Sequence, residues 1–163
     1  MHTQAQSQHR WLQQLLGDWT NTTTMDAELP DSSKTTHGTE TVTALGDLWI
    51  VGQSRGDMPG GGMADMRMTL GYDADQQRFV GNWVGSMMHT MFVYQGTLDD
   101  SQNVLTLDTE GPSFSGDGST ARYQDVITLK GSNERTLHSQ TLQPDGSWKR
   151  FMVATYQRVS PRS

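Results

Sequence analysis

The sequence contains no cysteine, and this absence excludes several kinds of chemistry. The chain has no disulfide framework, no thiolate nucleophile and no cysteine-ligated zinc or iron–sulfur site. It does not need such cross-links, because a domain of 163 residues buries about two thirds of the surface of its unfolded chain. We therefore expect one domain that spans residues 1–163 and folds around a hydrophobic core in a reducing compartment.

Basic residues and long apolar runs are also scarce. Three lysines and nine arginines stand against 18 acidic residues, and the net charge is −6. Nucleic acids and anionic membranes attract clusters of positive charge, so neither is an expected partner. Residues 1–14 are polar, and no stretch of the chain approaches the roughly 18 apolar residues of a membrane-spanning helix. These absences predict a soluble, cytoplasmic protein.

The chain does contain a series of ten strand-like segments separated by turn-sized gaps. Short connections place consecutive strands side by side and antiparallel, and a series of this length can close on itself. The pattern therefore predicts an all-β fold, an antiparallel barrel of about ten strands over residues 17–158. The expected strands are 18–27, 36–44, 48–57, 64–72, 78–85, 90–98, 104–110, 122–130, 135–142 and 147–158.

One helical segment precedes the strands. In residues 8–16 the side chains of Trp11, Leu12, Leu15 and Leu16 form an apolar stripe on an otherwise glutamine-rich helix, which stops at Gly17. A helix with such a stripe must cover an apolar surface. We expect residues 1–16 to form a tail and a helix that caps one end of the barrel.

Alternation within a strand assigns its side chains to the two faces of the sheet, provided that no β-bulge changes the parity. It predicts that Met66, Met68, Trp83 and Met152 line the interior, and it leaves the parity of strand 90–98 open. The sequence has ten methionines. Because methionine is flexible and polarizable, such an interior suits a pocket for apolar ligands, a dry core or, as a third alternative, a Cu(I) site.

Four ionisable residues are candidates to orient a ligand. Glu40 and Arg150 fall on largely apolar faces, Arg122 begins a strand, and His89 follows two methionines. An unpaired buried charge costs several kcal/mol, so such a group needs a partner or a ligand. The alternatives are structural ion pairs and strand-end side chains in water. Glu40 and His89 are also candidate general bases.

A set of motifs in the same order resembles a bacterial family, the domain of unknown function numbered 1579, over nearly the whole chain. The family is similar to the calycins, the lipocalin-like barrels. The resemblance implies that a Gly-x-Trp opening starts the first strand and that its tryptophan closes one end of the barrel. The motifs are Leu15-Leu16-Gly17-Asp18-Trp19, Gly38-Thr39-Glu40, Met58-Pro59-Gly60-Gly61-Gly62, Leu70-Gly71-Tyr72-Asp73, the run 81–88 and Arg122-Tyr123-Gln124-Asp125-Val126.

The calycin resemblance also raises the question of a cofactor. The nitrobindins, one calycin branch, carry haem on a histidine of a late strand, and His138 is the positional candidate here, although the motif around it does not match. The five histidines have neither His-x-His nor helical i, i+4 spacing, so no metal site is predicted. No cofactor is predicted from the residues themselves.

These observations support three functional hypotheses. The first is binding of a small, mostly apolar or amphipathic molecule inside the barrel. The second is a cofactor-free isomerase, lyase or hydrolase that uses the same cavity. The third is a solid barrel whose surface binds a protein partner or a second copy of the chain, giving a homodimer. A cavity of about 300 Å³ or more would favour the first two hypotheses over the third.

Overall fold

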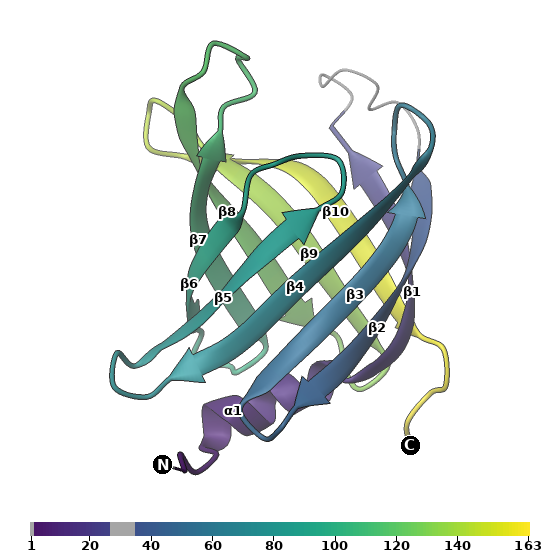
Figure 1. Ribbon diagram of the computed structural model, residues 1–163, viewed down its shortest axis with the longest axis vertical. Helices are drawn as coiled ribbons and strands as arrows, with labels where there is room; N and C mark the ends of the chain where they lie inside the picture. The colour runs from purple at the N-terminus through teal and green to yellow at the C-terminus, as the bar shows by residue number, and fades with distance from the viewer. Residues whose placement is uncertain (1, 27–34) are drawn as a thin grey trace.

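Antiparallel strands dominate the computed structural model, which describes residues 2–26 and 35–163 (Figure 1). Within these residues ten strands form one closed barrel, in the order β1-β10-β9-β8-β7-β6-β5-β4-β3-β2. The predicted all-β barrel is confirmed. The strands are β1 (Gly17–Met25), β2 (Thr36–Leu45), β3 (Trp49–Asp57), β4 (Met63–Asp73), β5 (Arg78–Gly85), β6 (Phe92–Leu98), β7 (Val104–Pro112), β8 (Thr120–Leu129), β9 (Glu134–Leu142) and β10 (Trp148–Arg158).

The predicted strand boundaries differ from the observed ones mainly beside the longer loops. The strand expected over 90–98 begins only at Phe92. The two strands that flank the loop of residues 113–119 run further than expected. β7 extends to Pro112 and β8 begins at Thr120, because these two residues still pair in the ladder. The expected end of the first strand, Ala27, lies outside the described residues.

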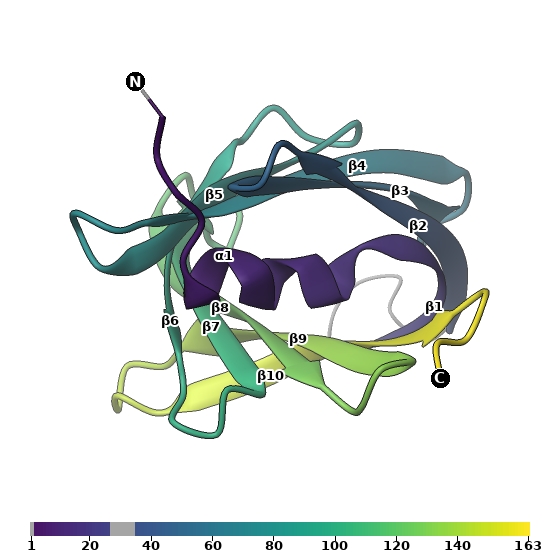
Figure 2. The ribbon, with the colours of Figure 1, turned by 90° about the horizontal axis from the view of Figure 1, so that it is seen from below.

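The helical segment lies across one end of the barrel (Figure 2). It consists of α1 (Ser7–Leu12) and the 3₁₀ turn η1 (Gln13–Leu15), so the predicted helix is present and tightens in its last turn. Its apolar side chains Trp11, Leu12 and Leu15 are buried against the barrel. Each such burial contributes about 1.5–3 kcal/mol. No helix in the described part of the chain is long and apolar enough to cross a membrane.

The residues at the start of β1 explain how this end is closed. Gly17 has a φ of +123°, and a Cβ there would lie 2.6 Å from Arg158 Nη1, so glycine is required both for the turn out of the helix and for space. Trp19 is 2 % exposed and donates its indole N–H to the carbonyl of Leu15. The Arg158 guanidinium covers the Trp19 ring at 4.2 Å and donates to the carbonyl of Gln14. These bonds satisfy carbonyls that the end of the helix leaves free.

The structure also settles which side chains face inward in β6 and β10. In β6 Tyr94 is buried and Val93 is exposed, so Phe92 and Tyr94 share the inner face. In β10 the pairing with β9 shifts between Arg150 and Met152, which marks a β-bulge. The prediction that Arg150 shares the inner face with Met152 is therefore wrong, because one extra residue reverses the parity.

The buried core lies between the helix and the middle of the barrel. Side chains from most strands pack against Trp11, Leu12 and Leu15 in one cluster. Several of the same residues also border the cavity described next, so the core forms its floor. The other members of the cluster are Trp19, Val42, Ile50, Leu70, Phe79, Tyr94, Leu105, Leu107, Ile127 and Leu137.

Candidate functional site

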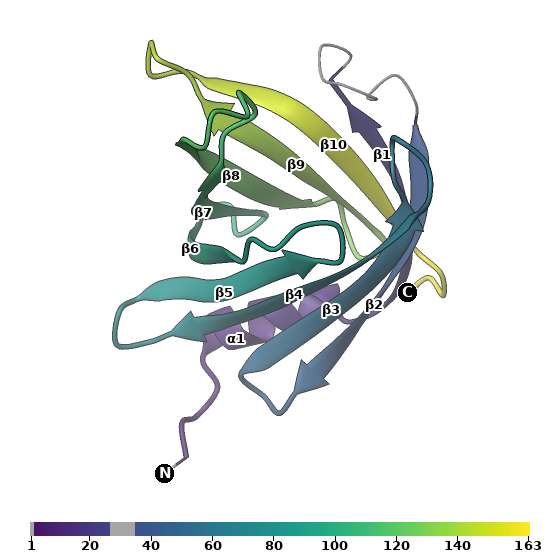
Figure 3. The same ribbon diagram turned by 45° about the horizontal axis from the view of Figure 1, so that its top comes forward.

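The half of the barrel farther from α1 encloses a cavity of about 460 Å³. Its lining includes side chains from the loops that follow β3, β5 and β7, such as Met58, Met88 and Phe114. These loops project from the end opposite α1, which Figure 3 tilts toward the viewer. The cavity therefore reaches the rim of the barrel at one end and meets the packed core at the other.

Methionine makes up much of the apolar wall. Seven of the ten methionines line the cavity: Met25, Met58, Met66, Met68, Met87, Met88 and Met152. They come from three strands, β1, β4 and β10, and from the loops that follow β3 and β5, whereas β6 to β9 contribute none, so flexible thioether side chains form one part of the wall. Such a wall can adjust to apolar molecules of different shape.

Aromatic rings form the second part of the wall. Trp83 packs edge to face on Phe92 with ring centroids 5.8 Å apart, and Phe92 packs in the same way on Tyr123 at 6.3 Å. The chain of rings continues to Phe151 at 5.9 Å from Tyr123. A Cβ at Gly111 would lie 2.1 Å from the Phe92 ring, so this glycine provides the space that the ring occupies.

One pair of charges is buried near the floor of the cavity. Arg135 donates from Nη2 to Glu40, and the side chains are only 4 % and 10 % exposed. The guanidinium also lies 3.9 Å from the Tyr156 ring centroid and 4.7 Å from that of Trp19. Its charge is thus balanced by a carboxylate, and its planar faces are covered by rings. Burial raises the pKa of Tyr156 well above its usual range, and Glu40 adds to this effect.

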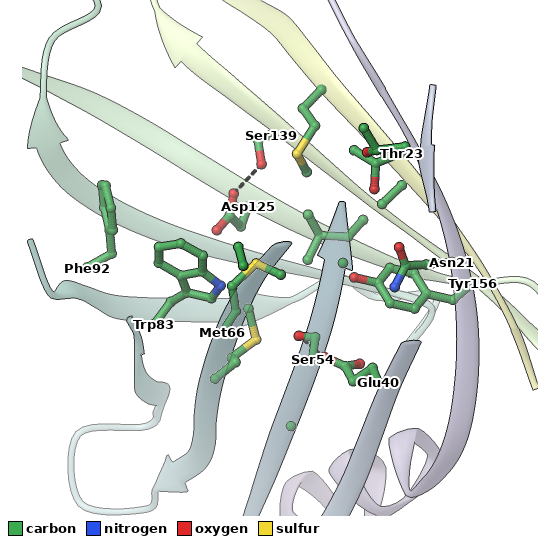
Figure 4. Close-up of a pocket in the computed structure, with 18 of the residues that line it drawn as sticks. Asn21, Thr23, Glu40, Ser54, Met66, Trp83, Phe92, Asp125, Ser139 and Tyr156 are labelled. Atoms are coloured by element: carbon green, nitrogen blue, oxygen red, sulfur yellow. Dashed lines mark hydrogen bonds between the residues drawn. The ribbon is translucent and has the colours of Figure 1, made fainter. Parts of the chain in front are cut away.

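A second carboxyl group faces the cavity without a cation. Asp125 accepts hydrogen bonds from the Tyr94 hydroxyl and from the Ser139 hydroxyl, the latter at 2.5 Å (Figure 4). No ion pair to it is formed within residues 2–26 and 35–163. Burial raises the pKa of Asp125, although the bonds from Ser139 and Tyr94 act in the opposite direction. Burial also raises the pKa of Tyr94, and the Asp125 carboxyl raises it further.

Five of the eight residues predicted for the site line the cavity, and three do not. Those that line it are Glu40, Met66, Met68, Trp83 and Met152. His89 is exposed in the loop between β5 and β6. Arg122 is exposed and pairs across the strands with Glu110, on the face opposite to that of Tyr123. Arg150 faces outward because of the β-bulge.

The polar residues that sequence reasoning did not select are Asp125, Tyr94, Ser139 and Arg135. Alternation contained the signal for three of them. Asp125 lies between Tyr123 and Ile127 in the inward series of β8, and Arg135 and Ser139 flank Leu137 in the corresponding series of β9. The sequence did not show whether Tyr94 faces inward or outward, because apolar residues occupy both faces of β6.

The histidine considered for haem does not face the cavity. His138 alternates with the inward Leu137 and Ser139, and it pairs on the outer face with Val126 and Val153. Its position does not fit a haem ligand inside the barrel. In the described part of the chain no three His, Cys, Asp or Glu side chains group together as metal ligands would.

The fold and the site define the class of the protein, a closed ten-stranded β-barrel with an internal, largely apolar cavity. A family model described as a protein of unknown function, DUF1579, matches residues 4–158. The chain belongs to the DUF1579 family. No curated protein matches the chain.

Solved structures with a similar fold have distant sequences. The S-type phycobiliprotein lyase CPES from Guillardia theta is 12% identical, with a TM-score of 0.63, and the match covers 94% of this chain and 93% of that one. A redesigned β-barrel, mFAP1, bound to DFHBI, is 18% identical, with a TM-score of 0.48, covering 91% and 99%. At these identities the likeness to the lyase shows the fold alone.

Proposed function

We propose that the protein binds a small, mostly apolar molecule in the barrel cavity. The observation that carries the proposal is the open interior of about 460 Å³, walled by methionine and aromatic side chains. Ligand sites usually measure about 300–1,000 Å³ and combine apolar walls with a few polar groups, as this cavity does. A structural relative named as a phycobiliprotein lyase is in keeping with a barrel that handles small molecules, although that likeness shows only the fold.

The enzyme hypothesis receives less support from the same geometry. Of the two candidate bases, Glu40 is held by Arg135, and His89 lies exposed outside the cavity. A general base must reach a substrate proton within hydrogen-bond distance. Neither residue is placed for that role, so we propose binding rather than catalysis.

The test uses a neutral apolar probe, 1-naphthalenemethanol, titrated into the protein in a calorimeter. Ser54→Phe places a ring inside the cavity, because Ser54 lines it, whereas Gln53→Phe places the same ring on the outer face of β3. We expect binding to the wild type and to Gln53→Phe, and at least about tenfold weaker binding to Ser54→Phe. Circular dichroism confirms that both variants are folded.

Two results would contradict the proposal. One is no binding of the probe to the wild type at millimolar concentration. The other is equal binding to Ser54→Phe and Gln53→Phe, which would place the probe outside the barrel. Native mass spectrometry of protein purified from its own cells then asks which molecule occupies the cavity in life.

A further inference from the structure

The cavity holds an unequal set of buried charges. Of the charged groups that line it, two carboxyl groups, Glu40 and Asp125, and one guanidinium, Arg135, are largely buried, whereas His37, Arg55 and Asp57 are exposed. Arg135 pairs with Glu40, which leaves Asp125 without a cation among the residues that the structure describes. A buried carboxylate is stabilised by a positive charge and destabilised by a further negative one.

Asp125 also retains capacity to accept hydrogen bonds. A carboxylate offers about four lone-pair sites, and Tyr94 and Ser139 use one on each oxygen. The two hydroxyl groups fix the orientation of the carboxyl, because Tyr94 and Ser139 are themselves 1 % and 6 % exposed. Asp125 lines the cavity, and in Figure 4 its carboxyl lies above the Trp83 ring.

The surroundings of Asp125 suit a cation with an apolar body. Trp83 and Phe92 form an edge-to-face pair next to it, and aromatic faces attract organic cations. On the neighbouring strand β7, Leu107 pairs with Asp125, and Thr109 is the next residue that faces inward. Thr109 is 8 % exposed, and its hydroxyl has no hydrogen-bond partner within the described ranges. This hydroxyl provides a second acceptor for an N–H group.

We infer that the cavity selects an amphipathic amine, whose ammonium group pairs with Asp125 and whose apolar part packs against the methionine and aromatic wall. The inference rests on the proposed function, since it names the class of molecule for the same cavity. An acid would be a poorer ligand. Its charge would add to those of Glu40 and Asp125, while the buried guanidinium of the cavity, that of Arg135, already donates from Nη2 to Glu40 and is covered by two rings, and only its Nε has no hydrogen-bond partner within the described residues.

Three probes of nearly equal shape test the inference by calorimetry at pH 7.5: 1-naphthalenemethylamine, 1-naphthalenemethanol and 1-naphthaleneacetic acid. A charge-assisted hydrogen bond to a fixed carboxylate is expected to improve affinity by about tenfold or more, so the amine should bind at least tenfold tighter than the alcohol. The acid should bind more weakly than the alcohol. This comparison uses the unaltered protein and does not depend on the folding of a variant.

Asp125→Asn then assigns the preference to one residue. The amide keeps the shape and can still bond Tyr94 and Ser139, so the variant should bind the alcohol as before and lose the preference for the amine. Asp108→Asn is the matched control, because Asp108 bonds Gln124 on the outer face. It should leave the preference unchanged.

The outcomes separate this inference from the proposed function. Equal binding of amine and alcohol, tighter binding of the acid, or an amine preference that survives in Asp125→Asn would overturn the inference and leave the cavity as a binding site. Failure of all three probes to bind would overturn both.

Discussion

The buried pair of Glu40 and Arg135 provides the sharpest test of the interior as described. Arg135→Met keeps a long, flexible side chain but removes the charge, which leaves a carboxylate that is only 10 % exposed without its partner. Breaking a buried pair in this way costs about 3–5 kcal/mol. For a domain of this size, each kcal/mol lowers the melting temperature by about 2–4 °C, so we expect a decrease of about 6–20 °C.

Urea unfolding gives the change in the free energy of unfolding, and a thermal scan gives the change in melting temperature. Both are followed by far-ultraviolet circular dichroism, which does not depend on the fluorescence of Trp19 beneath the guanidinium. Arg55→Met is the control, because Arg55 and Asp65 form an exposed pair at 3.8 Å that should contribute about 1 kcal/mol at most. Adding Glu40→Leu to Arg135→Met should restore most of the stability, since no unpaired charge remains. The reasoning is refuted if Arg135→Met costs no more than Arg55→Met.

Two further predictions concern stability. Gly81→Ala should destabilise the protein by about 3 kcal/mol in urea unfolding, because the new Cβ would lie 2.0 Å from a backbone oxygen. Gly71→Ala should cost less, because the new Cβ would meet the half-exposed Trp49 ring, which can move. Equal costs for the two variants would contradict this. Since burial raises the pKa of Asp125, the unfolded chain releases this proton at lower pH than the folded protein, and stability is lost as the pH rises toward the folded pKa. Asp125→Asn should therefore raise the urea midpoint at pH 7 and change it little at pH 3.5. Each unit of pKa shift corresponds to about 1.4 kcal/mol in the free energy of unfolding. An equal change in the midpoint at both pH values would contradict the prediction.

The barrel could be predicted from the sequence because its signals are local. Turn residues separate the strands, and the stripe of Trp11, Leu12 and Leu15 identifies the helix that covers one end. Alternation also placed Met66 and Trp83 on the inner face correctly. These features depend on neighbouring residues in the chain, so no knowledge of distant contacts is needed.

The polar part of the site was harder to predict because it depends on contacts between distant strands. The β-bulge before Met152 reverses the face of Arg150, and nothing in the local pattern of β10 reveals the extra residue. The pairing of Glu40 with Arg135 joins β2 to β9 across the barrel, at a separation of 95 residues. Which charge is paired and which is left for a ligand can be decided only once the barrel is closed.

The central claim is that the interior of this barrel is open and accepts a molecule. A crystal structure of the protein grown with 1-naphthalenemethanol tests it most directly. The account predicts electron density for the naphthalene ring inside the barrel, in contact with Met68 and Trp83. An interior filled by its own side chains, with the probe absent or bound only to the outer surface, would contradict it.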